Sequence, residues 1–234
     1  KSRQMVVGKG MVAKGFSSYE KNSEVLIFAS GVSNSTNKDI AKFDKEKTLL
    51  LEIMATNPGK QLVYFSTCSV YDESLRESPY VLHKLQMESI IERAHSNFLI
   101  FRVSNIAGRT KNPHTILNYF FTHIKDGVHF NLWENAKRNI ISMDDLFILC
   151  NKIIEQHLFK NEIINVANPV SYDVKYIVSA LEKFIGKNGN YTLIQKGSGP
   201  QINLSKIKHC MNNLDMHFND EYLQNILQQY FVKP

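Results

Sequence analysis

The stretch that decides the fold runs from Leu62 to Glu88 and reads LVYFSTCSVYDESLRESPYVLHKLQME. Its first four residues, 62–65, are apolar and predict a buried strand. The strand leads into a hydroxyl-rich tip at residues 66–69. A polar loop then separates this tip from a predicted helix that starts at Ser78, because serine is a frequent helix cap and proline is favoured directly after it.

Two reactive side chains lie on the first turns of that helix. Tyr80 and Lys84 are four residues apart and therefore share one helix face. A hydroxyl at the strand tip, a phenol and an ammonium group can meet at one place in this arrangement. Such a group of side chains predicts a proton-donating site for chemistry at a carbonyl. An ordinary phenol has a pKa of about 10, so Lys84 would supply the nearby positive charge that it needs.

Apolar strands alternate with helices through the rest of the chain. Strands are predicted at 4–7, 25–29, 98–103, 139–141 and 163–167, and helices at 39–55, 79–93, 114–125, 146–156, 172–185 and 220–230. The alternation predicts an α/β fold of the Rossmann type, with a doubly wound, mostly parallel sheet. We expect a single Rossmann-like domain over 1–234, in which about 109–142 and 168–234 form a smaller C-terminal substrate lobe.

A phosphate-binding loop is predicted after the first strand. Residues 8–13 have the form G-x-G-x-x-A and are followed by a predicted helix. The predicted contacts to a dinucleotide are Gly8, Lys9, Gly10, Met11 and Val12. Ser30 and Gly31 lie at the tip of the next strand, where a ribose-binding Asp or Glu is usual, so the pattern leaves NAD and NADP both open.

Composition limits the setting and the partners of the chain. Three widely spaced cysteines predict neither a disulfide framework nor a metal site, and they favour a cytoplasmic location. The net charge of +6 comes from scattered lysines, and the mixed-sign run 43–47 is expected to be a solvated helix face. We therefore expect no nucleic-acid partner, and we expect neither a membrane span nor a signal peptide, because no apolar run is long enough.

Five segments, taken in order, resemble the extended short-chain dehydrogenase/reductase family. They are residues 25–31 (VLIFASG), 63–71 (VYFSTCSVY), 80–84 (YVLHK), 102–108 (RVSNIAG) and 138–145 (RNIISMDD). The resemblance is to the nucleotide-sugar branch, the NAD-dependent epimerases and dehydratases, with a shortened N-terminal cofactor region. It implies Thr67, Tyr80 and Lys84 as catalytic residues, and Ala29, Ser30, Gly31, Tyr80 and Lys84 as further cofactor contacts. It also implies Cys68, Ser69, Asn105, Asn112 and Arg138 as substrate contacts.

The resemblance implies an NAD(P)-dependent reductase or epimerase that acts on a keto-sugar, linked to a nucleotide. Cys68 and Ser69 stand where 4,6-dehydratases of the family carry Asp and Glu, which argues against dehydration. The alternative is a non-catalytic or weakly cofactor-binding relative that acts as a binding or regulatory protein. The short N-terminal half favours that alternative, and a homodimer remains open. His83 is expected to have no role in the site, whereas His114 fits a site residue and a surface residue equally well.

Overall fold

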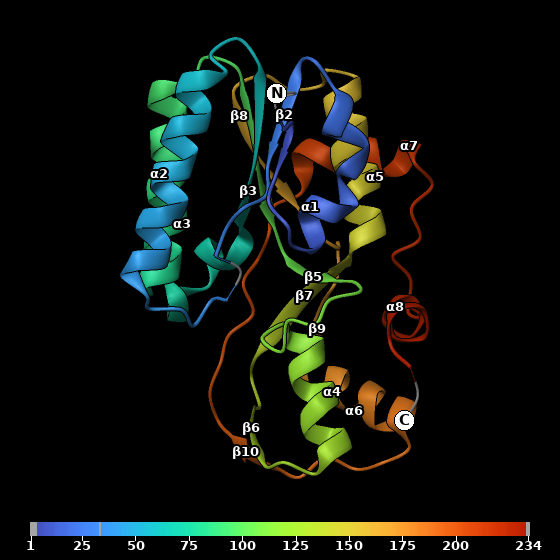
Figure 1. The fold of residues 1–234 in the computed structure, drawn as a ribbon. Helices are drawn as coiled ribbons and strands as arrows, with labels where there is room; N and C mark the ends of the chain where they lie inside the picture. Colours follow the sequence, from blue (N-terminus) through green and yellow to red (C-terminus); the bar gives the residue numbers. More distant parts are fainter. Residues whose placement is uncertain (1–3, 33, 233–234) are drawn as a thin grey trace.

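A parallel sheet forms the centre of the computed structural model, which describes residues 4–32 and 34–232. Its strands run in the order β1-β2-β3-β4-β8, and every neighbouring pair is parallel. The strands are β1 (Val6–Val7), β2 (Val25–Phe28), β3 (Gln61–Thr67), β4 (Phe98–Val103) and β8 (Glu162–Val166). The α/β, doubly wound fold expected from the alternation is therefore confirmed (Figure 1).

Helices cover both faces of this sheet (Figure 1). Successive residues of a strand point to opposite faces, so each strand contributes side chains to both helix layers. Leu62 and Tyr64 pack under α2 (Ile40–Thr56) and α3 (Pro79–Ala94) on one face. Val63 and Phe65 face α1 (Met11–Gly15), α5 (Met143–Glu155) and α7 (Lys208–Asn213) on the other. The strands are thus apolar on both sides, as expected for a covered parallel sheet.

The two edges of the sheet are each accompanied by a short 3-10 segment. η1 (Ser17–Lys21) follows α1 and packs against β1, which is the edge strand on one side. η4 (Ser205–Ile207) packs against β8 at the other edge. The chain passes directly from η1 into β2, so no further strand lies between them.

A second group of elements has its own apolar core and lies beside the carboxyl ends of the strands (Figure 1). It holds β5 (Asn105–Ala107), α4 (Ile116–Asp126), β6 (Phe130–Trp133), β7 (Lys137–Ser142), β9 (Ser171–Asp173), α6 (Val174–Ile185), β10 (Tyr191–Ile194) and α8 (Tyr222–Tyr230). We refer to these elements as the lobe. β5 pairs with β7 and β7 with β9, whereas β6 pairs with β10.

Several local predictions differ from the structure. The helix expected over 39–55 begins at Ile40, and this first residue is 71% exposed. The helix expected from residue 146 begins three residues earlier, at Met143, and its cap is Ser142. The Ser142 hydroxyl accepts from the Asp145 amide, which satisfies one of the free N–H groups of the first turn.

The first glycine of the G-x-G-x-x-A loop is required by packing. Gly8 has φ of +135°, and a Cβ at this position would lie 2.4 Å from the Ala29 carbonyl oxygen. Ala29 continues β2, so the loop after β1 lies directly on the backbone of the neighbouring strand. Only a residue without a side chain fits there.

Gly8→Ala is expected to lower the free energy of unfolding by at least about 2 kcal/mol, because the new methyl group meets fixed backbone in a strained conformation. Gly59→Ala is the matched control, since a Cβ there meets nothing within 4 Å. We expect the control to change stability by no more than about 0.5 kcal/mol. Urea unfolding of both variants measures the difference, and equal stabilities would contradict this account of Gly8.

Candidate functional site

A cavity of about 610 Å³ lies where the carboxyl ends of the strands face the lobe. This is the place where ligands bind in open parallel sheets, because loops from neighbouring strands diverge there. Every predicted site residue except Gly8 lines it: Lys9, Gly10, Met11, Val12, Ala29, Ser30, Gly31, Thr67, Cys68, Ser69, Tyr80, Lys84, Asn105, Asn112 and Arg138. Gly8 has the packing role described above and does not reach the cavity.

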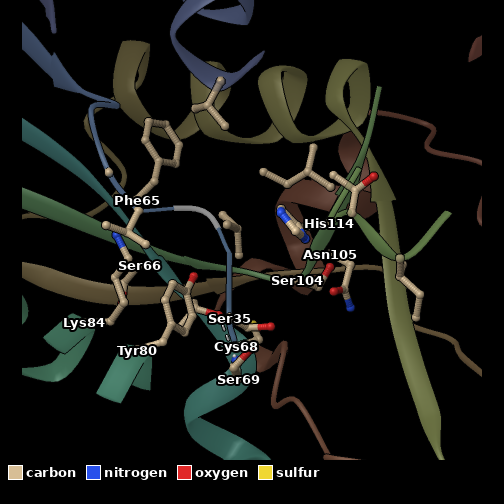
Figure 2. A pocket seen from close by; sticks show the side chains of 18 of the residues that line it. Ser35, Phe65, Ser66, Cys68, Ser69, Tyr80, Lys84, Ser104, Asn105 and His114 are labelled. Atoms are coloured by element: carbon tan, nitrogen blue, oxygen red, sulfur yellow. Dashed lines mark hydrogen bonds between the residues drawn. The ribbon is translucent and has the colours of Figure 1, made fainter. Parts of the chain in front are cut away.

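The expected catalytic side chains come from two elements (Figure 2). Thr67 ends β3, while Tyr80 and Lys84 lie on the first turns of α3, whose start is capped by the Ser78 hydroxyl. All three are largely buried and line the cavity. In Figure 2, Tyr80 and Lys84 lie on one side of the cavity, and Asn105 lies on the other.

The Thr67 hydroxyl is held by a local hydrogen bond. Its Oγ1 accepts from the Ser69 amide at 3.0 Å, which caps the short 3-10 segment η2 (Cys68–Tyr71). A hydroxyl has one donor and two acceptor positions, so this bond leaves the O–H of Thr67 available to a ligand in the cavity.

Lys84 forms an ion pair with Glu46, a residue of the run 43–47 that was expected to be solvated. Its Nζ donates to Glu46 Oε1 and to the Tyr64 hydroxyl, both at 3.0 Å. Glu46 lies on α2 and is only 4% exposed. The expectation of a solvated run at 43–47 was therefore wrong at Glu46, whereas Phe43 is buried as its place on the inner helix face requires.

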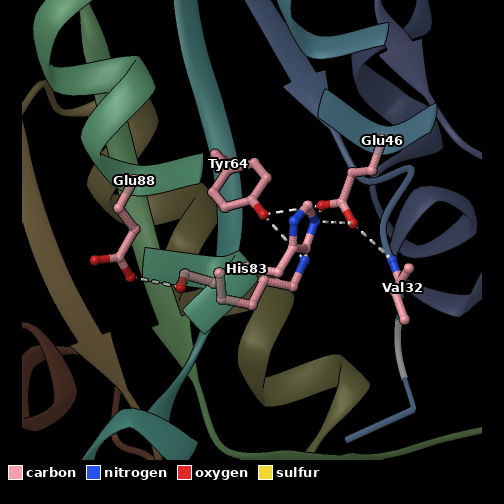
Figure 3. A network of polar contacts seen from close by, with 7 residues as sticks. Val32, Glu46, Tyr64, His83 and Glu88 are labelled. Carbon is pink, nitrogen blue, oxygen red and sulfur yellow. Dashed lines mark hydrogen bonds and ion pairs between the residues drawn. The ribbon is translucent and has the colours of Figure 1, made fainter. Parts of the chain in front are cut away.

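His83 also belongs to this buried network (Figure 3). Its Nε2 lies 3.0 Å from Glu46 Oε2 and donates to it, since an ionised carboxylate only accepts. The amide of Val32 donates to the same oxygen at 2.9 Å, and the Tyr64 hydroxyl donates to Oε1. Burial by itself would raise the pKa of Glu46, but the bond from His83 and the charge of Lys84 outweigh it and lower the pKa to about 2.

A second buried carboxylate, Glu88, is bonded to the carboxyl end of β3. Glu88 accepts from the Ser66 hydroxyl at 2.5 Å and from two nitrogens of Arg102, at 2.9 and 2.6 Å. Arg102 in turn donates to the Tyr71 hydroxyl at 3.0 Å. These bonds join α3, β3 and β4 next to Thr67. They therefore fix the carboxyl end of β3 relative to the helix that carries Tyr80.

The lobe side of the cavity is polar and carries positive charge. The Arg138 guanidinium lies 3.9 Å from Asp72, and burial lowers the pKa of Arg138. Asn105 donates to the Asn139 carbonyl at 2.8 Å, which joins β5 to β7. Sequence reasoning missed Asp72, which is 4% exposed, because nothing in its local pattern distinguishes it from a loop residue.

Two features of the cavity fit a polar ligand. The Ser104 hydroxyl lines it and, among the described residues, is one of the buried polar groups that lack a partner. A Cβ at Gly10 would meet nothing within 4 Å, so open space lies directly over the backbone of the predicted phosphate loop. The residues present therefore fit a dinucleotide at this end of the sheet.

Cys68 is an unreactive thiol in this setting. It is 4% exposed, its sulfur donates to the Arg102 carbonyl, and burial raises its pKa to about 12. A thiol with this pKa stays protonated near neutrality and supplies no base.

The fold and the cavity are those of an α/β protein of the Rossmann-like, doubly wound class. The model of the NAD dependent epimerase/dehydratase family matches residues 16–167. The chain belongs to this family, and the expected membership is confirmed. The sequence matches none of the curated proteins.

Solved structures with the same fold include three that are bound to ligands. The UDP-N-acetylglucosamine 4-epimerase of Methanobrevibacter ruminantium, in complex with UDP-N-acetylmuramic acid, is 14% identical, with a TM-score of 0.67 over 89% of this chain and 76% of that chain. The dTDP-glucose 4,6-dehydratase of Bacillus anthracis, in complex with NAD, is 18% identical, with a TM-score of 0.69 over 94% and 77%. RMD from Pseudomonas aeruginosa, complexed with NADPH, is 13% identical, with a TM-score of 0.66 over 85% and 88%.

Two features are absent from residues 4–32 and 34–232: a group of metal-binding side chains and a membrane-spanning helix. In these ranges no three His, Cys, Asp or Glu side chains are grouped so that they could hold a metal ion. No helix in the same ranges combines the length and the apolar character needed to cross a bilayer.

The folded protein is expected to lose stability in acid through Glu46. Its pKa falls from 4.5 to about 2 on folding, so the ionised carboxylate stabilises the fold above pH 4.5, and this contribution is lost as the pH falls toward 2. Between pH 5 and pH 3 the loss should be about 2 kcal/mol. Urea unfolding at both pH values measures it, with Glu46→Gln expected to lack this loss.

Glu52→Gln is the control for this measurement, because Glu52 is exposed on the same helix. It should keep the acid loss of the unsubstituted protein. An acid loss of the same size in Glu46→Gln would show that other carboxylates cause it.

Proposed function

We propose that the protein is an NAD(P)-dependent reductase or epimerase that acts on a keto-sugar linked to a nucleotide. The observation that carries the proposal is the shared cavity: Thr67, Tyr80 and Lys84 line it together with the open loop at Gly10. Family membership and the ligands bound to the similar structures, NAD, NADPH and a UDP-linked sugar, support it.

In the proposed mechanism Tyr80 exchanges a proton with the substrate oxygen. Thr67 donates its free O–H to that same oxygen and orients it. Lys84 donates to a ribose hydroxyl of the cofactor. The bound nicotinamide supplies or accepts the hydride. Tyr80 is only 8% exposed, so the surrounding protein covers most of its surface.

The substrate side of the proposal rests on the lobe. Arg138 and Lys137 line the cavity and offer positive charge to the phosphates of a nucleotide. Asn105 and Ser69 offer amide and hydroxyl groups to the sugar. Cys68 stays protonated and Ser69 is a hydroxyl, so no pair of carboxylates is available for dehydration at these two positions. We therefore favour reduction or epimerisation.

A non-catalytic or weakly cofactor-binding relative is the second candidate, and one observation favours it. β1 is the edge strand of the sheet, and η1 leads directly into β2. Within the described residues, therefore, no strand flanks β1 where the adenosine half of a dinucleotide is usually held. The outcome of a cofactor titration separates the two candidates.

Titration with NADH and NADPH, followed by nicotinamide fluorescence, is expected to show binding of both with affinities that differ by less than about fivefold. The physical reason is that no described side chain beyond β1 reads the adenosine ribose. Gly10→Ala should weaken both at least tenfold, because the methyl group fills space that the phosphates need. Gly59→Ala is the control and should bind as the unsubstituted protein does.

Absence of binding at millimolar concentrations of both cofactors would favour the non-catalytic candidate. A preference of more than about fiftyfold for one cofactor would show that an unrecognised group reads the adenosine ribose.

Tyr80→Phe is expected to lower turnover at least about a thousandfold while leaving the dissociation constant for NADH within about twofold, because only the proton-transferring hydroxyl is removed. Turnover is measured on a panel of UDP-linked and dTDP-linked sugars and their keto derivatives. Tyr176→Phe, at an exposed tyrosine, should keep full turnover. Unchanged turnover in Tyr80→Phe would remove Tyr80 from the mechanism.

A further inference from the structure

The position of Lys84 is set by contacts with other side chains rather than by its own helix. Its ammonium has three N–H donors, and two of them are used by Glu46 and by the Tyr64 hydroxyl. The ammonium also lies 5.0 Å from the centre of the Tyr64 ring. Among the residues that the structure describes, no partner uses the third donor, and Lys84 lines the cavity, so this N–H can donate to a ligand hydroxyl.

Glu46 has no capacity left for a ligand. Its two oxygens accept from Lys84, Tyr64, His83 and the Val32 amide, which come from α3, β3 and the segment after β2 (Figure 3). The His83 ring is in turn stacked on Phe43 of α2, with 4.5 Å between ring centres. A carboxylate held by these four donors has a fixed position. Because Lys84 donates to it, the position of the Lys84 ammonium is fixed as well.

The ion pair between Lys84 and Glu46 lies directly against the backbone at Gly31, in the loop after β2. A Cβ at Gly31 would be 2.9 Å from Lys84 Nζ and 3.0 Å from Glu46 Oε1. Val32, the next residue, is bonded to the same carboxylate. Glu46 therefore sets the ammonium of Lys84 and the loop at residues 30–32 relative to each other.

We propose that Glu46 is a positioning residue for cofactor binding, which places the one free N–H of Lys84 on a hydroxyl of the nicotinamide ribose. The inference rests on the proposed function, since it presumes that a nicotinamide cofactor occupies the cavity. Without the carboxylate, the flexible lysine stem has no fixed acceptor and the ammonium leaves this position. Glu46 itself touches no ligand and acts through Lys84.

A double-mutant cycle on NADH binding tests the inference. Glu46→Gln and Lys84→Met are each expected to raise the dissociation constant for NADH at least tenfold. The double variant should bind no more weakly than the weaker single variant, because both changes remove the same contact. Glu52→Gln, the same substitution at an exposed site of α2, should bind normally. Additive losses in the double variant would overturn the inference.

Reduced nicotinamide mononucleotide separates this role from a general structural one. It carries the nicotinamide ribose without the adenosine half, so Glu46→Gln should weaken it by the same factor as NADH. A smaller loss for the mononucleotide would place the effect elsewhere and overturn the inference.

Thermal unfolding of each variant shows whether it is folded, since Glu46→Gln leaves a buried ammonium without its partner. Glu46→Asp keeps the charge but withdraws the carboxylate by one methylene, and it is expected to bind NADH with intermediate affinity. If Glu46→Gln does not fold, normal binding by Glu46→Asp overturns the inference. Failure of the unsubstituted protein to bind NADH or NADPH would instead overturn the proposed function.

Discussion

A carboxylate in the interior of a protein is stable only when its charge is matched and both oxygens are bonded, and Glu46 imposes this condition on the structure. The partners that satisfy it come from α3, from β3 and from the backbone after β2. α2 and α3 can therefore dock on the sheet in one register only. The cavity depends on this register, because α3 carries Tyr80 and Lys84 and the segment after β2 carries Ser30 and Gly31.

The parts of the site that could be predicted are those in which function is encoded locally. A helix places residues four apart on one face, and parallel strands bring their carboxyl ends to one edge of the sheet. These two rules are enough to predict that Tyr80, Lys84 and the strand ends lie close together. Glu46 and His83 were missed for the opposite reason. Glu46 stands among lysines and aspartate in α2, a pattern typical of an exposed face, and its partners lie 37 and 38 residues further on.

The lobe was less predictable than the sheet, because its strands are short and pair over long distances in the chain. β6 alternates between buried and exposed residues, and its partner β10 is mostly exposed, so neither has the continuous apolar character of β3. Their pairing, Phe130 with Tyr191 and Trp133 with Ile194, joins segments that lie far apart in the chain and that local sequence does not connect.

The position of β1 at the rim of the sheet has a consequence for solubility. An edge strand presents unpaired N–H and C=O groups, which can recruit a strand from another molecule and start aggregation. β1 is only two residues long, and η1 packs against it, while η4 packs against β8 at the opposite rim. The shortness of β1 and the packing of η1 and η4 thus reduce the backbone that the two edges offer to a strand of another chain.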